Sequence, residues 1–129
     1  MLTGKNVVLG VTGGIAAYKA AEILRGLRKK GAGVSVVMTA NARRFVGPLT
    51  FEALSGRPVA EDLFSPAGDA RMEHLALAQS ADLVLIAPAT ANTIAKLAAG
   101  LADDLLSTLV LATAAPVLVA PAKIGRAHV

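Results

Sequence analysis

The chain has 129 residues, of which 54% are hydrophobic and 3% aromatic, and its 13 basic and 9 acidic residues give a net charge of +4. That length suffices for one domain with a buried core and is too short for two. The absence of cysteine excludes disulfides and cysteine-ligated metal sites, and we expect a cytoplasmic protein without a metal. No apolar run approaches the roughly 20 residues of a membrane span, and Gly13 and Gly14 interrupt the run over 5–20, so neither a span nor a signal peptide is expected.

The first 38 residues predict two strands with a helix between them. The runs 7–11 and 34–38 are apolar and rich in valine, as is typical of buried strands. Helical spacing of apolar residues extends over 15–30 and stops at Gly31. This order predicts a right-handed βαβ unit with parallel strands.

The rest of the chain continues the alternation of helices and strands. The apolar patterns and their breaks predict a short helix over 49–54 ended by Gly56, a brief edge strand within 58–64 and a loop over 65–69. A helix through Met72, Leu75 and Leu77 and a strand over 83–86 are expected next. The last predicted elements are a helix over 94–99 ended by Gly100, a helix opened by Asp103 and Asp104 that runs to about Thr113, and a strand over 117–120. The aliphatic composition is typical of helices packed on a parallel sheet. We therefore predict an α/β fold, a three-layer Rossmann-like (flavodoxin-like) parallel sheet with helices on both faces.

The net positive charge also raises the hypothesis of a nucleic-acid binder. Its basic cluster, over 25–30, lies in the last turns of a predicted helix, where cations complement the helix dipole. No aromatic side chains lie among these residues, as stacking on bases would require. The interpretation as a solvated helix end is therefore favoured, and no nucleic-acid partner is expected.

The turn between the first strand and the first helix is the strongest local indication of a ligand. Residues 10–15 read Gly-Val-Thr-Gly-Gly-Ile, and backbone amides at a helix start can bind a phosphate that glycine lets approach. The pattern is neither G-x-G-x-x-G nor a Walker A loop, and no acidic residue ends the second strand, so NAD is disfavoured. A tight turn without a ligand remains the alternative.

Ligands of doubly wound sheets bind beyond the carboxyl ends of the strands. We therefore expect residues 12–14, Thr39 and residues 88–93 to converge on one crevice. The hydroxyls of Thr90 and Thr93 and the amide of Asn92 could bind a phosphate or the polar edge of a ring. The alternative for Thr90 is a plain helix cap.

His74 is a candidate acid or base, because the ordinary pKa of histidine lies near 6.5. Neither a Ser-His-Asp arrangement nor metal-ligand spacing accompanies it. On the residues alone, a structural histidine is the more common case.

Several motifs in the same order resemble one known family. Residues 10–19 and the stretch Pro88-Ala89-Thr90-Ala91-Asn92-Thr93 resemble the homo-oligomeric flavin-containing cysteine decarboxylases, whose second motif has serine where Thr90 stands. Residues 50–56 and 99–106 are similar to the amino-terminal half of the bacterial bifunctional phosphopantothenoylcysteine decarboxylase/ligases. The resemblance covers residues 4–122.

The resemblance implies a cofactor, a reaction and a set of residues. FMN would be bound with its phosphate near Gly13, Gly14, Ile15 and Thr39, its ring near Phe45, and further contacts from Thr90, Ala91, Asn92 and Thr93. The implied reaction is decarboxylation of 4′-phosphopantothenoylcysteine to 4′-phosphopantetheine in coenzyme A biosynthesis. His74 matches the family's catalytic histidine, so the resemblance implies that it transfers a proton while the cofactor carries the redox chemistry. A homotrimer or dodecamer is implied as well.

Other members of the fold and another class of function remain open. A peptidyl-cysteine decarboxylase and a flavin prenyltransferase are the alternatives within the resemblance. A non-catalytic flavin-binding module, with His74 in a structural role, is the alternative outside catalysis.

The end of the chain departs from the family pattern. The family continues with Ala-Met-Asn after Ala-Pro, where this chain has Ala120-Pro121-Ala122-Lys123, so the substrate-binding asparagine is missing. Residues 123–129 show no periodicity, and we expect them to be a non-native read-through tail. Without Lys123 and Arg126 the net charge falls to +2. We therefore expect residues 1–122 to be an FMN-binding decarboxylase domain, incomplete at its C-terminus and inactive alone.

Overall fold

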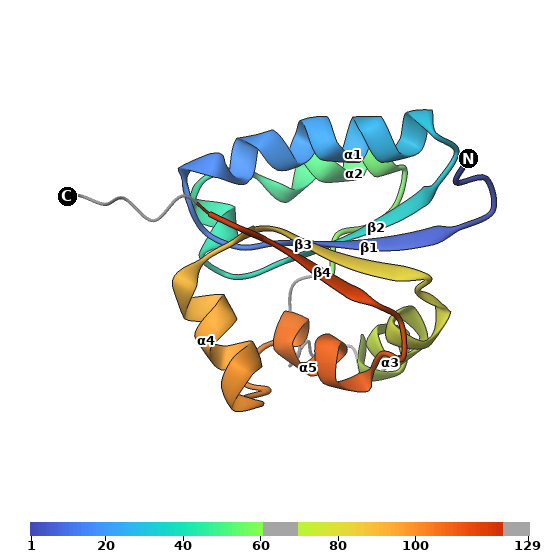
Figure 1. The fold of residues 1–129 in the computed structure, drawn as a ribbon. Coiled ribbons are helices and arrows are strands. Elements are labelled where there is room, and N and C mark those ends of the chain that lie inside the picture. The colour runs from blue at the N-terminus through green and yellow to red at the C-terminus, as the bar shows by residue number, and fades with distance from the viewer. Residues whose placement is uncertain (61–69, 123–129) are drawn as a thin grey trace.

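A single parallel sheet forms the middle layer of the protein (Figure 1). This is a computed structural model, which describes residues 1–60 and 70–122, with only the backbone of residues 70–74. The strands of the described residues are β1 (Asn6–Val11), β2 (Gly33–Met38), β3 (Leu83–Ala89) and β4 (Val117–Pro121). They pair in the order β2-β1-β3-β4, all in parallel.

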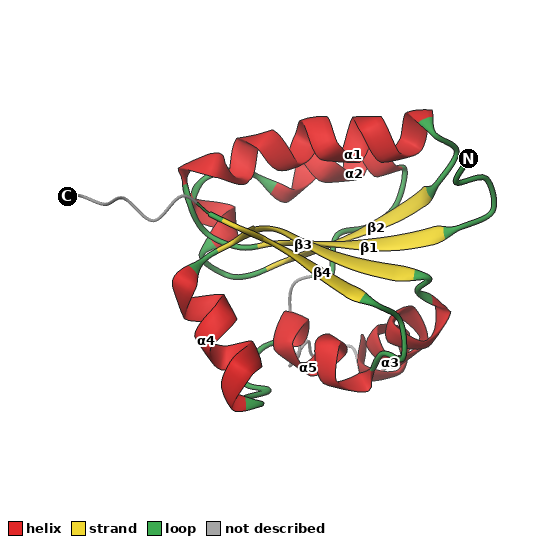
Figure 2. Ribbon diagram, in the orientation of Figure 1, coloured by secondary structure: helices red, strands yellow, loops and turns green. Residues whose placement is uncertain are grey.

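Helices cover both faces of this sheet (Figure 2). One face carries α1 (Lys19–Lys29), which continues the 3₁₀ turn η1 (Ile15–Tyr18), and α2 (Pro48–Ser55), which follows the 3₁₀ turn η2 (Ala42–Arg44). The other face carries α3 (Ala70–Ser80), α4 (Ala91–Ala99) and α5 (Leu105–Ala112). The predicted α/β class with three layers is confirmed.

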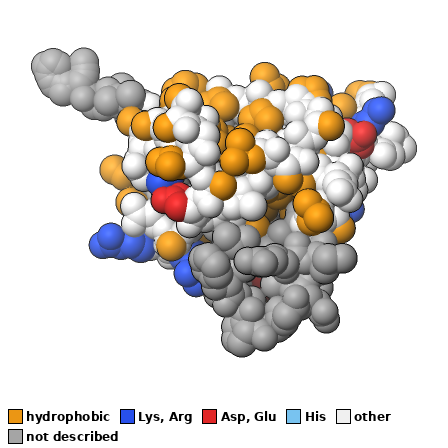
Figure 3. Space-filling view, turned by 90° about the horizontal axis from the view of Figure 1, so that it is seen from below, with side chains coloured by type: hydrophobic (Ala, Val, Ile, Leu, Met, Phe, Trp, Pro, Cys, Tyr) orange, Lys and Arg blue, Asp and Glu red, His pale blue; other side chains and the backbone are white. Residues whose placement is uncertain are grey.

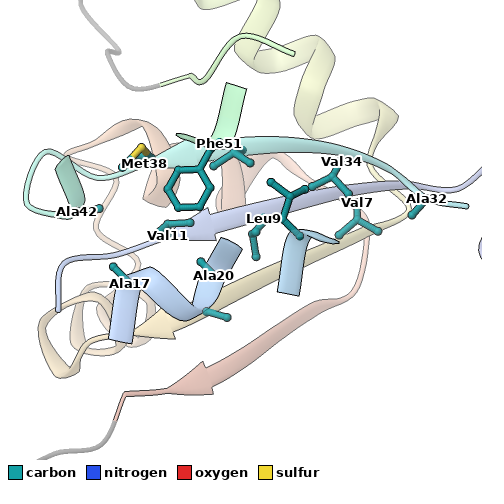
Figure 4. Close-up of a cluster of buried hydrophobic side chains, with 13 residues drawn as sticks. Val7, Leu9, Val11, Ala17, Ala20, Ala32, Val34, Met38, Ala42 and Phe51 are labelled. Atoms are coloured by element: carbon teal, nitrogen blue, oxygen red, sulfur yellow. The ribbon is translucent and has the colours of Figure 1, made fainter. Parts of the chain in front are cut away.

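The valine-rich strands build two hydrophobic cores, because successive side chains of a strand point to opposite faces. On the side of α1 and α2, the core contains Leu9, Val11 and Met38, and Phe51 of α2 points in between the last two (Figure 4). On the side of α3 and α5, a second core joins residues of β1, β2 and β3 to leucines of α5. Its strand residues include Val8, Val37, Val84 and Ile86. Burial on both faces is why β1, β2 and β3 read as almost continuous apolar runs, whereas β4, expected from its apolar sequence to be buried, is mostly exposed.

Most predicted element ends are confirmed, and the differences have local causes. Gly31, Gly56 and Gly100 follow α1, α2 and α4 with positive φ, a conformation that glycine adopts without strain. The helix predicted over 15–30 begins as a 3₁₀ turn. The helix predicted over 94–99 begins at Ala91, since Thr90 caps it. The helix expected to open at 103–104 begins at Leu105, because Asp104 is its cap.

Three expectations fall wholly or partly outside the described residues. The loop over 65–69 and the tail over 123–129 lie outside them, as do residues 61–64 of the expected edge strand. Within the described part of that strand, Ala60 forms a parallel bridge with Val37 at the outer side of β2. Among the described residues, no helix is long and apolar enough to cross a membrane.

Candidate functional site

The site lies where the chain changes direction across the sheet. β1 is followed by a helix on one face and β3, its neighbour in the sheet, by a helix on the other face. At such a switch point the connections diverge and leave a crevice beyond the carboxyl ends of the strands. The segments after β1, β2 and β3 therefore all border the same space.

A pocket of about 400 Å³ occupies this crevice. Each of the first three strands contributes residues from the turn that follows it, and α4 and the cap of α5 complete the lining. The lining residues are Gly13, Thr39, Ala40, Asn41, Thr90, Asn92, Thr93, Lys96 and Asp104. The structure thus brings together five residues that the sequence had put forward as ligand contacts: Gly13, Thr39, Thr90, Asn92 and Thr93.

Gly13 permits the close approach of two turns. A Cβ atom built at this position would lie 2.7 Å from the Cβ of Asn41 and 3.0 Å from its carbonyl carbon. No side chain fits there without moving the backbone after β2. At Gly14, by contrast, the nearest atom to such a Cβ would be the Cγ2 of Thr90 at 4.0 Å, which leaves open space beside the backbone.

Thr12 joins the ends of β1 and β3. Its buried hydroxyl donates to the carbonyl of Pro88 at 2.5 Å and accepts from the backbone N–H of Thr90 at 3.0 Å. The Ala87–Pro88 peptide in this segment is cis. The turn that carries Thr90 is therefore tied directly to the residue that precedes Gly13.

Thr90 is the N-cap of α4, so the capping interpretation of this residue is confirmed. Its hydroxyl accepts from the backbone N–H of Thr93 at 3.2 Å and donates to the Thr93 hydroxyl at 3.1 Å. The Thr93 hydroxyl keeps its own proton for another acceptor. The backbone N–H groups of Ala91 and Asn92, in the first turn of α4, have no partner within the helix.

The lining supplies mainly hydrogen-bond donors. The Thr39 hydroxyl accepts from the N–H of Ala42 at 3.2 Å, which leaves its proton to donate. Within the described part of the chain, the side-chain amides of Asn41 and Asn92 form no hydrogen bond. A cluster of unpaired donors next to a helix N-terminus favours an anionic ligand.

Lys96 is the cation of the pocket. Its Nζ lies 3.2 Å from Oδ1 of Asp103 and 3.7 Å from Oδ2 of Asp104. The hydrogen bond to Asp103 and the charge of Asp104 raise the pKa of Lys96, against the opposing effect of burial. Asp104 is further engaged as the cap of α5, where it accepts from the N–H of Ser107 at 2.8 Å. Lys96 and the first turn of α5 thus both stabilise the Asp104 carboxylate.

The other predicted site residues lie beside the pocket or outside its described lining. Gly14 and Ala91 are the chain neighbours of lining residues. Ile15 and Phe45 are exposed to 81% and 50%, at the start of η1 and the end of η2. His74 belongs to α3, and its side chain lies outside what the structure describes.

Asn41, Lys96 and Asp104 were not singled out from the sequence as ligand contacts. One local signal existed for Lys96, because it follows Thr93 by three residues and so shares a face of α4 with it. Among the described residues, no three His, Cys, Asp or Glu side chains are grouped as a metal site would require.

Comparison with known proteins identifies the family. The sequence pattern that defines the family named Flavoprotein matches residues 1–124. The chain belongs to the Flavoprotein family. Among curated relatives of this flavoprotein, the coenzyme A biosynthesis bifunctional protein CoaBC of Vibrio cholerae is 59% identical over 121 residues, which is 94% of this chain and 30% of the relative. The chain thus spans about a third of the length of the curated relatives it matches.

Solved structures share the fold. The FMN-dependent cysteine decarboxylase SpaF has a TM-score of 0.84 at 38% identity, covering 94% of this flavoprotein and 70% of SpaF. A mutant PPC decarboxylase complexed with pantothenoylaminoethenethiol has a TM-score of 0.72 at 28% identity, covering 93% and 68% of the two chains. The resemblance to flavin-containing decarboxylases is confirmed at the level of both sequence and fold.

Proposed function

We propose that this flavoprotein binds FMN in the pocket at the strand ends, and that the site serves the FMN-dependent decarboxylation of 4′-phosphopantothenoylcysteine in coenzyme A biosynthesis. One observation carries the proposal. Donors from three successive strand-to-helix turns meet around Gly13, in a chain that is 59% identical to a coenzyme A biosynthesis protein.

The phosphate of FMN would be held at the Gly13 end of the pocket. Gly13 and Gly14 expose their backbone, Ile15 begins η1, and the Thr39 hydroxyl retains a proton. Because Gly14 has open space beside it, an anion can approach the backbone there without a side chain in its way. Lys96 lies farther along α4 and is paired with Asp103 and Asp104, so the attraction for the phosphate comes from the hydrogen-bond donors and the helix start.

The flavin ring would be flanked by α4 and by Phe45. The first turn of α4 offers the N–H groups of Ala91 and Asn92, which have no partner within the helix, together with the Asn92 amide and the Thr93 hydroxyl. This donor set suits the carbonyl and nitrogen edge of a flavin. Phe45 is half exposed and would supply an aromatic surface.

The chemistry of these side chains indicates which steps the cofactor and the protein would each perform. Bound FMN would supply the redox chemistry that none of these residues can provide. The turns bind and orient the cofactor, and His74, at the start of α3, would hold or transfer a proton at the substrate thiol or carboxylate. The catalytic assignment of His74 rests on its match to the family motif.

The proposal is tested by titrating the purified chain with FMN. We expect saturable quenching of flavin fluorescence and a yellow protein at micromolar FMN, because the hydrogen-bond donors of the pocket favour the phosphate ester. Riboflavin, which lacks the phosphate, should bind more weakly. A chain that stays colourless at these concentrations contradicts the proposal.

A cysteine at the end of a peptide is the second candidate substrate. The observation in its favour is SpaF, an FMN-dependent cysteine decarboxylase with a higher TM-score and identity to this chain than the PPC decarboxylase structure. The two are separated in a chimera in which residues 1–122 replace the matching part of the Vibrio cholerae relative. Release of carbon dioxide from phosphopantothenoylcysteine supports the first candidate, and release only from a cysteine-terminated peptide supports the second.

Assembly into a homo-oligomer, either a trimer or a dodecamer built from trimers, is part of the proposal. A cytoplasmic location is proposed as well. Ile15, Phe45 and Leu49 are large apolar side chains exposed near the pocket end of the sheet, which supports a surface covered by a second copy. Leu101 and Leu111 are exposed as well, and hydrophobic side chains are visible on the underside of the molecule in Figure 3. Light scattering measures the mass, and a monomer at all concentrations would refute this part.

A further inference from the structure

The hydroxyl of Thr12 forms two hydrogen bonds, one as donor and one as acceptor, between two turns that both border the pocket. It lies at the end of β1, is 1% exposed, donates to the Pro88 carbonyl and accepts from the Thr90 N–H. The Thr12 N–H also donates to the Pro88 carbonyl, at 3.3 Å. Three hydrogen bonds therefore connect one residue of the first turn to two residues of the third.

The position of Thr90 decides where α4 begins. Its hydroxyl caps the helix at Thr93, and its carbonyl accepts from the N–H of Ile94 at 2.9 Å. The donors of the first turn, on Asn92 and Thr93, are placed by this cap. Fixing the Thr90 backbone to Thr12 thus fixes those donors relative to the backbone of Gly13, the next residue along from Thr12.

We propose that Thr12 is a positioning residue of the cofactor pocket, which holds the first and third turns in register so that the donors from both reach one bound FMN. The inference rests on the proposed FMN site. Thr12 itself touches no ligand in this scheme, because both its donor and its acceptor face Pro88 and Thr90.

The side-chain chemistry predicts which substitutions matter. Thr12→Val keeps the shape but removes the hydroxyl, so the Thr90 N–H loses its acceptor and only the backbone bond from Thr12 to Pro88 still joins the two turns. Thr12→Ser keeps both hydrogen bonds. A positioning role requires the first change to weaken FMN binding and the second to leave it near the wild-type value.

Thr113 provides a matched control far along the chain. Its hydroxyl also donates to a backbone carbonyl, that of Ala78 at 2.8 Å, and accepts from a backbone N–H, that of Ala115 at 3.1 Å. Thr113 does not line the pocket. Thr113→Val therefore removes two side-chain hydrogen bonds of the same kind, at a half-buried position, without touching the two turns.

The experiment measures the FMN dissociation constant and the thermal midpoint of all three variants, with the wild-type chain as reference. We expect Thr12→Val to lose roughly tenfold or more in FMN affinity, in line with an unsatisfied buried donor, at a temperature where it is folded. Thr12→Ser should bind FMN about as tightly as the wild-type chain. Thr113→Val should lower the thermal midpoint and leave the FMN affinity unchanged.

Two results overturn the positioning role. One is a Thr12→Val variant that binds FMN as tightly as the wild type, and the other is a Thr113→Val variant that loses affinity to the same extent. If the wild-type chain itself binds no FMN, the proposed function fails. That outcome is recorded before any variant is compared, so the two failures are distinguishable.

Discussion

Gly13→Ala is expected to remove most of the FMN affinity. The added methyl group would lie 2.7 Å from the Cβ of Asn41 and 3.0 Å from its backbone carbon, so the turns after β1 and β2 must separate. Overpacking of this kind costs about 1–3 kcal/mol, which corresponds to roughly 5- to 150-fold in the FMN dissociation constant when the binding site is what moves. Titration of flavin fluorescence measures the effect directly.

Alanine substitutions at two other glycines distinguish a steric effect on the fold from a loss of contact with the ligand. Gly14→Ala meets only Thr90 at 4.0 Å, so we expect an unchanged thermal midpoint but a weaker FMN complex, because the methyl group occupies the space proposed for the phosphate. Gly26→Ala, in the middle of α1 with nothing within 4 Å, should alter neither binding nor fold adversely. Wild-type affinity in both the Gly13 and the Gly14 variants would place the phosphate elsewhere.

His74→Asn is expected to abolish turnover while the protein stays yellow. Loss of a general acid or base typically lowers the rate by about 10²- to 10⁴-fold, whereas the pocket residues that would hold FMN are unchanged. The measurement is carbon dioxide release in the chimera with the Vibrio cholerae relative, alongside its flavin absorbance.

A second variant in the same helix serves as the control. Gln79→Ala changes an exposed polar residue of α3 and should leave both colour and rate unchanged. If the His74 variant releases carbon dioxide at the wild-type rate, His74 is a structural residue and its catalytic assignment is wrong. If it loses FMN instead, its role is in folding or binding.

The order of elements could be predicted because local chemistry determines it. Valine-rich runs are typical of strands in a sheet that helices cover on both faces, and glycines at 31, 56 and 100 end helices because they take positive φ. The convergence of three turns followed from one further rule, that parallel strands end at the same edge of the sheet.

The missed residues depend on distances that no local pattern contains. Asn41 and Gly13 are neighbours only because β1 and β2 pair in register, and Asp104 reaches Lys96 only because α5 begins beside the end of α4. Thr12 lies in the glycine motif, yet its sequence context does not reveal that its partners are 76 and 78 residues away. The local pattern at Thr90 was compatible with a helix cap and with a ligand contact, and the hydrogen bond from the Thr93 N–H shows the cap.

The ion pair of Lys96 with its two aspartates has a consequence for titration experiments. A raised pKa means that the stabilising charge on the amine is complete below its ordinary value of 10.5 and disappears only in still more alkaline solution. Around neutrality this amine therefore does not change its protonation. The second ionisation of a phosphate ester, near pH ~6, does fall in that range. A change in FMN affinity between mildly acidic and neutral buffer would accordingly report the charge of the ligand rather than that of the amine.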